Sequence, residues 1–238
     1  MEEFLLDNSE TEKLFRQIVK AIPSMQNGIT AESMTQRGIV YEKNWGVSLV
    51  DLKSFIANIE KDHLLALKLW NKKWRETMIL ATMIDQPEAV SEEQMDFWVR
   101  TAGNTEIVEQ MVTNLFSQTP FAFAKALEWC RGKKFLVKYA GLLMMGRLSL
   151  TAKNDIDEMF EVFFEVLPPL AKDPSLNNIF YRSYCQLARR SEYLHNACLS
   201  MAQALTQMPE QNAQNTGLEL LNELQTEEFV TLIKRKEE

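Results

Sequence analysis

Apolar residues recur along nearly the whole chain with the period of an α-helix. Between residues 104 and 116 the apolar positions are Ile107, Val108, Met111, Val112, Leu115 and Phe116. This spacing places them on one stripe of an amphipathic helix. Residues 77–84 and 135–148 are apolar on nearly every side, so we expect them to form central helices. Strand-like alternation between turn dipeptides is missing, and the sequence therefore predicts an all-α protein.

Turn and capping residues divide this pattern into short helices. A helix is expected to end before Pro87 and another to begin at Ser91, and Gly103-Asn104 marks a further boundary. The pattern predicts roughly eleven to fourteen helices of about 9–17 residues. They form consecutive pairs of about 35–45 residues, the spacing of HEAT-type arrays. With no long linker, we expect a single domain over residues 1–238 that forms a curved α-α superhelix of HEAT-like helix pairs.

The composition excludes several classes of protein. The 238 residues include 3 Cys, at distant positions, and 2 His, with no CxxC pair. A disulfide scaffold and a zinc module are therefore not expected. The chain has no signal-peptide pattern at its start and no apolar run near the ~18 residues of a membrane span. We expect a cytoplasmic protein that does not enter a membrane.

Charge is distributed unevenly along the chain. The net charge is −7 at pH 7, yet residues 131–200 contain 10 Lys/Arg and 7 Asp/Glu. A locally basic segment in an acidic chain is compatible with one surface that faces a polyanion. Charges scattered over solvated helix faces would give the same count. Both interpretations remain open at the level of composition.

Five segments form an ordered pattern between about residues 30 and 205. They read NWGVSLVDL at 44–52, ALKLW and RETMILATMID within 66–85, EEQMDFWV at 92–99, FLVKYAG at 135–141 and QLARRSEYLH at 186–195. Taken together in this order, they resemble the AlkD-like family of DNA alkylation repair enzymes, which are HEAT-like repeat DNA glycosylases. The resemblance implies a curved stack of helix pairs that holds duplex DNA in a basic concave groove. It also implies hydrolysis of the N-glycosidic bond of cationic, ring-alkylated purines.

The resemblance implies a catalytic carboxylate on the helix that follows the third segment. In the family, an aromatic residue and this carboxylate lie one turn apart. Here the stretch 105–110 reads TEIVEQ, so Glu109 stands at the carboxylate position and Thr105 where the aromatic residue belongs. Acidic residues are also common in the first turns of helices, so Glu109 has a structural interpretation as well. Its neighbour Glu106 is expected to be a solvated capping acid.

Other pocket positions depart further from the family pattern. Tyr139 replaces a family Arg, and Arg182 replaces a second aromatic, with Tyr181 and Tyr184 close by. We expect Thr105, Tyr139, Arg182 and Tyr184 to line the substrate pocket. The candidate phosphate contacts are Lys133, Lys134, Lys138, Arg189 and Arg190, together with Arg182. These substitutions favour a divergent member that is weak or inactive on the usual cationic lesions.

The resemblance implies no metal and no cofactor, and the expected partner is double-stranded DNA, including alkylated DNA, bound by a monomer. His195 and Cys198 are three residues apart but lack two further metal ligands nearby. The acidic residues between 155 and 165 are expected on one helix as a solvated face. The five tryptophans are expected to pack between helices. The alternative function is a non-enzymatic helical-repeat scaffold that binds DNA or protein.

Overall fold

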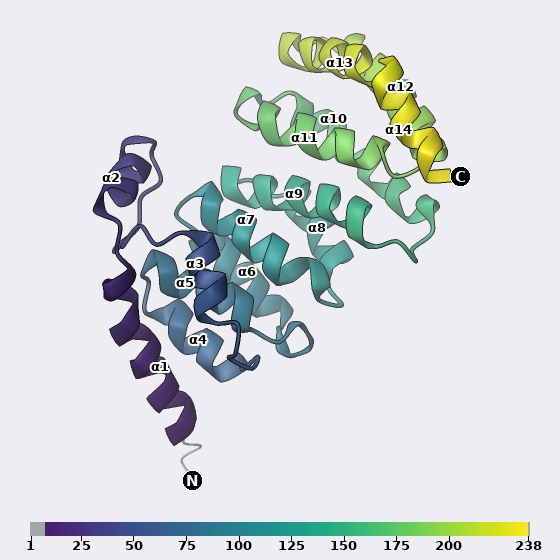
Figure 1. Cartoon of the computed structure of the whole chain (residues 1–238). Helices are drawn as coiled ribbons and strands as arrows, with labels where there is room; N and C mark the ends of the chain where they lie inside the picture. Colours follow the sequence, from purple (N-terminus) through teal and green to yellow (C-terminus); the bar gives the residue numbers. More distant parts are fainter. Residues whose placement is uncertain (1–7, 238) are drawn as a thin grey trace. The chain divides into compact units, whose positions relative to one another are not determined.

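The computed structural model describes residues 8–237, which form α-helices joined by short loops and 3-10 turns (Figure 1). No β-strand occurs within this range, where the extended backbone forms only an isolated bridge between Lys43 and Trp74. The predicted all-α fold is therefore confirmed. None of the described helices is both long enough and apolar enough to cross a membrane.

The chain divides into two compact units, residues 1–120 and residues 121–238. Each unit is described by itself below. The single domain expected over residues 1–238 stays a prediction.

The first unit contains seven described α-helices. They are α1 (Ser9–Ala21), α2 (Gly28–Gln36), α3 (Leu49–Phe55), α4 (His63–Asn71), α5 (Arg75–Ile84), α6 (Glu92–Thr101) and α7 (Thr105–Asn114), with 3-10 turns at Ile22–Met25, Pro87–Ala89 and Phe116–Gln118. The consecutive helices α4 and α5 pack together, whereas α5 also packs against α7, and α1 packs against α4 (Figure 1).

Helix α5 is the centre of the first unit, as its sequence predicts. Nine of its ten residues are buried, so this helix has no solvent face. Beside it, the indoles of Trp70 and Trp98 stack with ring centroids 3.9 Å apart and planes 2° from parallel. The capping prediction also holds, because the Ser91 hydroxyl accepts a hydrogen bond from the Gln94 backbone N–H at 3.2 Å.

The second unit repeats the arrangement of packed helix pairs. Its helices are α8 (Ala122–Cys130), α9 (Phe135–Thr151), α10 (Leu167–Ala171), α11 (Asn177–Ala188), α12 (Glu192–Thr206), α13 (Gln211–Leu224) and α14 (Glu227–Glu237), with 3-10 helices η4 (Asp157–Glu165) and η5 (Pro174–Leu176). Within this unit α9 packs against both α8 and α11, and α12 packs against both α11 and α13 (Figure 1).

Glycines allow α9 to approach both of its neighbours. A Cβ atom at Gly141 would lie 2.5 Å from the Cys130 nitrogen of α8, and one at Gly146 would lie 3.0 Å from the Ser183 Cα of α11. Distances near 3 Å and below are too short for a real side chain. The two glycines therefore fix α9, the predicted second central helix, between α8 and α11.

The acidic stretch after α9 differs from the prediction. Residues Asp157–Glu165 form the 3-10 helix η4 and not an α-helix. A 3-10 helix has three residues per turn, so side chains three apart lie on the same side. Phe160 and Phe163 are both fully buried, and this spacing of three fits the 3-10 period. The face with Asp157 is not simply solvated either, as described below.

Candidate active site

Helix α7 carries the predicted catalytic residue Glu109 and the predicted pocket residue Thr105. Thr105 is the first residue of this helix and Glu109 lies one turn later. Both side chains are half-buried. Ile107 and Val108 are fully buried beside them, which fixes the rotation of the helix about its axis. Thr105 and Glu109 therefore border the apolar stripe, as the periodicity predicts.

A buried ion pair holds the first turn of α7. The Arg75 guanidinium donates from Nη2 to Glu106 Oε1 at 2.7 Å and from Nε to Oε2 at 3.0 Å. The Arg75 side chain is 4% exposed and that of Glu106 is 16% exposed. The prediction of Glu106 as a solvated capping acid is therefore wrong. The sequence feature that could have revealed this ion pair is Arg75 at the start of a largely apolar helix, because a buried guanidinium requires a carboxylate partner.

The same guanidinium also holds the loop at residues 44–47. Arg75 Nη1 donates to the Val47 carbonyl at 2.8 Å and to Glu76 Oε1 at 3.1 Å. The Glu76 carboxylate is fully buried and accepts from the backbone N–H groups of Trp45 and Val47, each at 3.2 Å. Burial alone would lower the pKa of Arg75, but its hydrogen bonds with Glu106 and the negative charges of Glu106 and Glu76 raise it.

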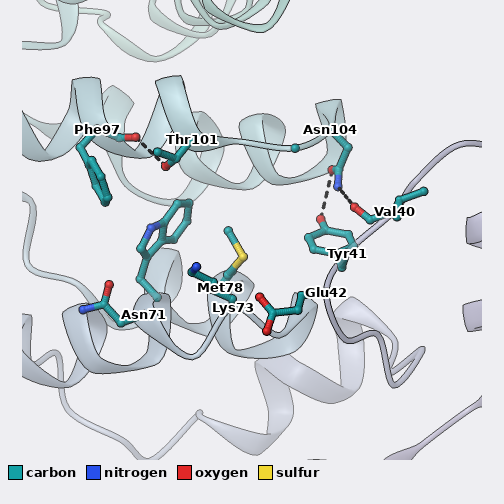
Figure 2. A pocket seen from close by; sticks show the side chains of 11 residues that line it. Val40, Tyr41, Glu42, Asn71, Lys73, Met78, Phe97, Thr101 and Asn104 are labelled. Carbon is teal, nitrogen blue, oxygen red and sulfur yellow. Dashed lines mark hydrogen bonds between the residues drawn. The ribbon is translucent and has the colours of Figure 1, made fainter.

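Tyr41 and Asn104 complete this network. The Tyr41 hydroxyl donates to Glu106 Oε2 at 2.8 Å and lies 3.2 Å from Asn104 Oδ1. Asn104 donates from Nδ2 to the Val40 carbonyl (Figure 2). It also caps α7 by accepting from the Ile107 N–H. Burial, followed by the charge of Glu106, raises the pKa of Tyr41 well above its ordinary value. These contacts set the position of α7 and hence of the Glu109 side chain.

In the second unit, the predicted phosphate contacts at the start of α9 differ in whether their charge faces solvent or is paired with an acid. Lys133 and Lys134 precede α9 and are exposed. Lys138 is half-buried, and its Nζ pairs with Asp173 Oδ2 at 2.6 Å. The Tyr139 ring lies near Phe135, with centroids 5.8 Å apart. Lys133 and Lys134 therefore present their charge to solvent, while that of Lys138 is already paired.

Tyr184 lies in the core of the second unit. It is fully buried, its ring stacks on Phe180 with centroids 5.7 Å apart, and its hydroxyl donates to the Cys198 carbonyl at 2.7 Å. This differs from the prediction of a pocket aromatic, because the contacts with Phe180 and the Cys198 carbonyl hold the Tyr184 side chain in the core. Tyr181 is the half-buried aromatic of this helix, and it lines a pocket of about 520 Å³ with Arg182 and Arg189.

Arg190 was predicted to contact phosphate, but its side chain is bound to acceptors within the protein. Its Nε donates to Asp157 Oδ1 at 2.7 Å, and its other nitrogens donate to the carbonyls of Ser149 and Asp155. The guanidinium carbon lies 4.3 Å from the centroid of the Phe160 ring. The side chain is only 8% exposed. Its donors are directed at protein acceptors and anchor η4.

The structure thus groups the predicted residues within each unit. Thr105 and Glu109 share one face of α7 in the first unit. Arg182 and Arg189 line one pocket in the second unit, and Lys133, Lys134, Lys138 and Tyr139 lie together at the start of α9. A joint role of these groups in one catalytic site stays a prediction. Among the described residues, no cluster of three or more His, Cys, Asp or Glu side chains is placed to hold a metal.

The sequence pattern of the family described as DNA alkylation repair enzyme matches residues 18–168 of the chain. The chain belongs to this family. The match includes α7 and the start of α9, so it covers the predicted catalytic position and part of the predicted phosphate contacts. The resemblance to this family is thereby confirmed, and the first four of the five segments lie within the matched range.

One solved structure is similar over most of both chains. It is described as "A new family of proteins related to the HEAT-like repeat DNA glycosylases with affinity for branched DNA structures". It matches with a TM-score of 0.69 and 18% identity, and the match covers 88% of this chain and 94% of that chain. At this identity the match establishes the HEAT-like helical fold. A comparison with curated proteins gives no match.

Proposed function

We propose that this member of the DNA alkylation repair family binds DNA and has weak or no base-excision activity. The observation that carries the proposal is the pair on α7, where Thr105 stands one turn from Glu109. In the family pattern an aromatic side chain occupies the position of Thr105. The proposal includes action as a cytoplasmic monomer without a cofactor.

The chemistry of excision explains why this substitution matters. Ring alkylation makes the base cationic, and bond breaking leaves a sugar with oxocarbenium character. A carboxylate near the sugar stabilises the developing charge, and an aromatic face holds the cation with about 0.5–2 kcal/mol. Thr105 offers no such face. The extra methylene of Glu109 displaces the charge by about 1 Å, a misplacement that costs on the order of 100-fold.

The second unit favours contact with phosphate over contact with a cationic base. Arg182 stands where the family has another aromatic residue, and it lines a pocket with Arg189 and with the acids Glu223 and Glu228. A guanidinium repels a cationic base but attracts a phosphate. Lys133 and Lys134 are exposed close to the start of α9. These cations support binding to the DNA backbone, which needs no excision chemistry.

The affinity for branched DNA described for the similar solved structure suggests the form of DNA to test. We propose that a four-way junction binds more tightly than a linear duplex of the same length. The experiment compares the two by fluorescence anisotropy in about 50 and 200 mM salt, a range over which phosphate-led binding weakens steeply. If neither DNA binds even at the lower salt, the DNA-binding proposal is wrong and the protein-scaffold alternative remains.

A further inference from the structure

The first unit contains a pocket of about 650 Å³ between α6 and the segments around residues 40–42 and 71–78. Phe97, Thr101 and Asn104 approach it from one side, while Asn71 and Lys73 approach from the other (Figure 2). Its volume lies in the range of about 300–1,000 Å³ that is typical of sites for small organic groups. Neither Thr105 nor Glu109 is among the lining residues, so this pocket is distinct from the predicted catalytic residue and its neighbour on α7.

Aromatic side chains form much of the pocket wall, and two of them are held rigidly. The Trp70 indole is backed by its parallel stack on Trp98. The Tyr41 ring is fixed by the hydrogen bonds of its hydroxyl to Asn104 and Glu106. Phe97, in contrast, is 54% exposed at the edge of the pocket. An exposed ring beside fixed aromatic walls provides a surface on which a planar group can stack.

Lys73 lies in the turn between α4 and α5 with an unusual backbone conformation. Its φ is 58°, the only positive φ of a non-glycine residue among those that the structure describes. This left-handed region is unfavourable for a residue with a Cβ atom. Asn or Gly would occupy the turn with less strain, so a lysine at a strained position that lines the pocket points to a role for its charge.

A basic and aromatic edge adjoins the pocket. Lys43 Nζ lies 4.1 Å from the Trp45 ring centroid, and Lys72 Nζ lies 4.7 Å from that of Trp74. The two indoles meet edge to face at 5.5 Å. Lys43 is next in sequence to the lining residue Glu42, and Lys72 is next to the lining residue Lys73.

These lysines are available for an anionic partner. Lys43, Lys72 and Lys73 form no ion pair with a carboxylate among the residues that the structure describes. Glu42 supplies a negative charge to the lining, so the pocket itself is close to neutral while the adjoining edge is positive. A neutral aromatic pocket beside a cationic edge matches a nucleobase attached to a phosphate backbone. Proteins that bind single-stranded nucleic acid combine the same two elements.

We propose that this pocket accepts one unpaired nucleobase of DNA. Phe97 stacks on the base, Asn71 and Thr101 offer polar groups to its edge, and the lysines at 43, 72 and 73 contact the flanking phosphates. The inference rests on the proposed DNA binding and deepens it, since unpaired bases occur where duplexes branch. A free nucleotide carries the same base and phosphate, so the experiment must separate the two sources.

The test uses the full chain and two short duplexes, one fully paired and one with a single bulged 2-aminopurine. Fluorescence anisotropy gives the affinity for each duplex, and the 2-aminopurine emission reports stacking of the base. We expect tighter binding of the bulged duplex and quenching of its emission. Phe97→Ala should weaken binding of the bulged duplex by about 5- to 150-fold, the range for loss of one base–aromatic stack. The same substitution should leave the paired duplex unaffected.

Two further variants sharpen the result. Val50→Ala is the matched control, because Val50 is another exposed apolar residue of the first unit, 73% exposed and outside the pocket lining. It should bind both duplexes as the unmodified chain does. Lys73→Asn removes the charge with a residue that tolerates a positive φ. It should lower the slope of log affinity against log salt by about 0.7–0.9.

The outcomes separate this inference from the proposed function. Equal affinity for the paired and bulged duplexes would overturn the pocket assignment and leave DNA binding intact. A second outcome is that free deoxyadenosine monophosphate competes with the DNA although the bulged duplex binds no more tightly than the paired one. The pocket would then be a site for a free nucleotide, and the inference that it accepts a base of DNA would be wrong. Failure of both duplexes to bind at low salt would refute DNA binding itself, and this inference with it.

Discussion

Arg75 and Glu106 form a two-point ion pair that ties α5 to the first turn of α7, with Nη2···Oε1 at 2.7 Å and Nε···Oε2 at 3.0 Å. Arg75 also contacts Glu76 and the Val47 carbonyl, so one buried guanidinium connects two helices and a loop. The residue predicted to perform chemistry, Glu109, lies on the helix that this ion pair positions.

Glu106→Gln should destabilise the first unit. It removes one charge partner from a guanidinium that is 4% exposed. Breaking a buried pair from one side costs about 3–5 kcal/mol, and we expect about 2–4 kcal/mol here because Glu76 remains. Denaturant unfolding gives the free energy of unfolding, and Glu88→Gln at an exposed site is the control. Equal stability of the Glu106 variant and the unmodified chain would contradict the structural role.

Thr105→Trp should increase release of an alkylated base. It restores an aromatic side chain one turn from Glu109, and a cation–π contact of about 0.5–2 kcal/mol corresponds to about 2- to 30-fold in rate. The assay measures free 7-methylguanine from a methylated duplex. Thr113→Trp serves as the control, because it adds the same ring at an exposed site two turns further along α7. Identical rates for the two variants would argue against a pocket at Thr105.

Variants of Arg190 and Lys134 should distinguish a structural role from a role in DNA binding. Arg190→Met removes the anchor of η4 and should lower the free energy of unfolding by about 2–4 kcal/mol, since Asp157 loses its partner. Lys134→Ala should leave stability unchanged and reduce the salt dependence of DNA binding by about one counterion. The opposite pattern, with a stable Arg190 variant that has lost a phosphate contact, would restore the prediction made from the sequence.

The Lys138–Asp173 pair should make the second unit less stable in acid. The hydrogen bond from Lys138, and next that from Ser175, lowers the pKa of Asp173 below its ordinary 3.8. A lowered pKa in the folded state means that the stabilisation is complete above the unfolded pKa and is lost as the pH falls through the folded pKa. Asp173→Asn should remove this part of the pH dependence below about pH 4, measured by urea unfolding at several pH values. An unchanged acid profile would contradict the assignment.

The three cysteines should be unreactive in the folded chain. Burial raises the pKa of the Cys130 and Cys185 thiols to about 12, and it also raises that of Cys198. Because the thiolate is the nucleophile, reaction with a disulfide reagent near pH 8 should be slow until the chain unfolds. Titration with such a reagent, with and without denaturant, counts the reactive thiols. Rapid reaction of any thiol without denaturant would show a more open structure.

The sequence predicts helices well where periodicity and capping agree. Helix α5 and the Ser91 cap are examples, because both depend on local pattern. The choice of Tyr184 over Tyr181 as the pocket aromatic was wrong, since the rotation of α11 is set by distant contacts such as the hydrogen bond from Tyr184 to the Cys198 carbonyl. The partners of Arg190 also come from residues more than thirty positions away.

In the candidate site, too, features set by local spacing could be predicted, and features set by distant contacts could not. The position of Glu109 beside the apolar stripe follows from helical spacing alone. The ion pair of Glu106 joins residues 31 apart, and no local pattern connects them. The prediction that the tryptophans pack between helices holds for Trp70 and Trp98, which stack in the core. Trp45 and Trp74 are instead half-buried beside lysines.

Single-turnover release of 7-methylguanine from a bound duplex tests the central claim most directly. The protein is added in excess at low salt, with anisotropy confirming that the DNA is bound, and free base is measured over time. The account predicts that the DNA is bound while the base is released little faster than without protein. Release at the rate of a dedicated glycosylase, together with its loss in Glu109→Gln, would contradict the claim of weak or absent excision.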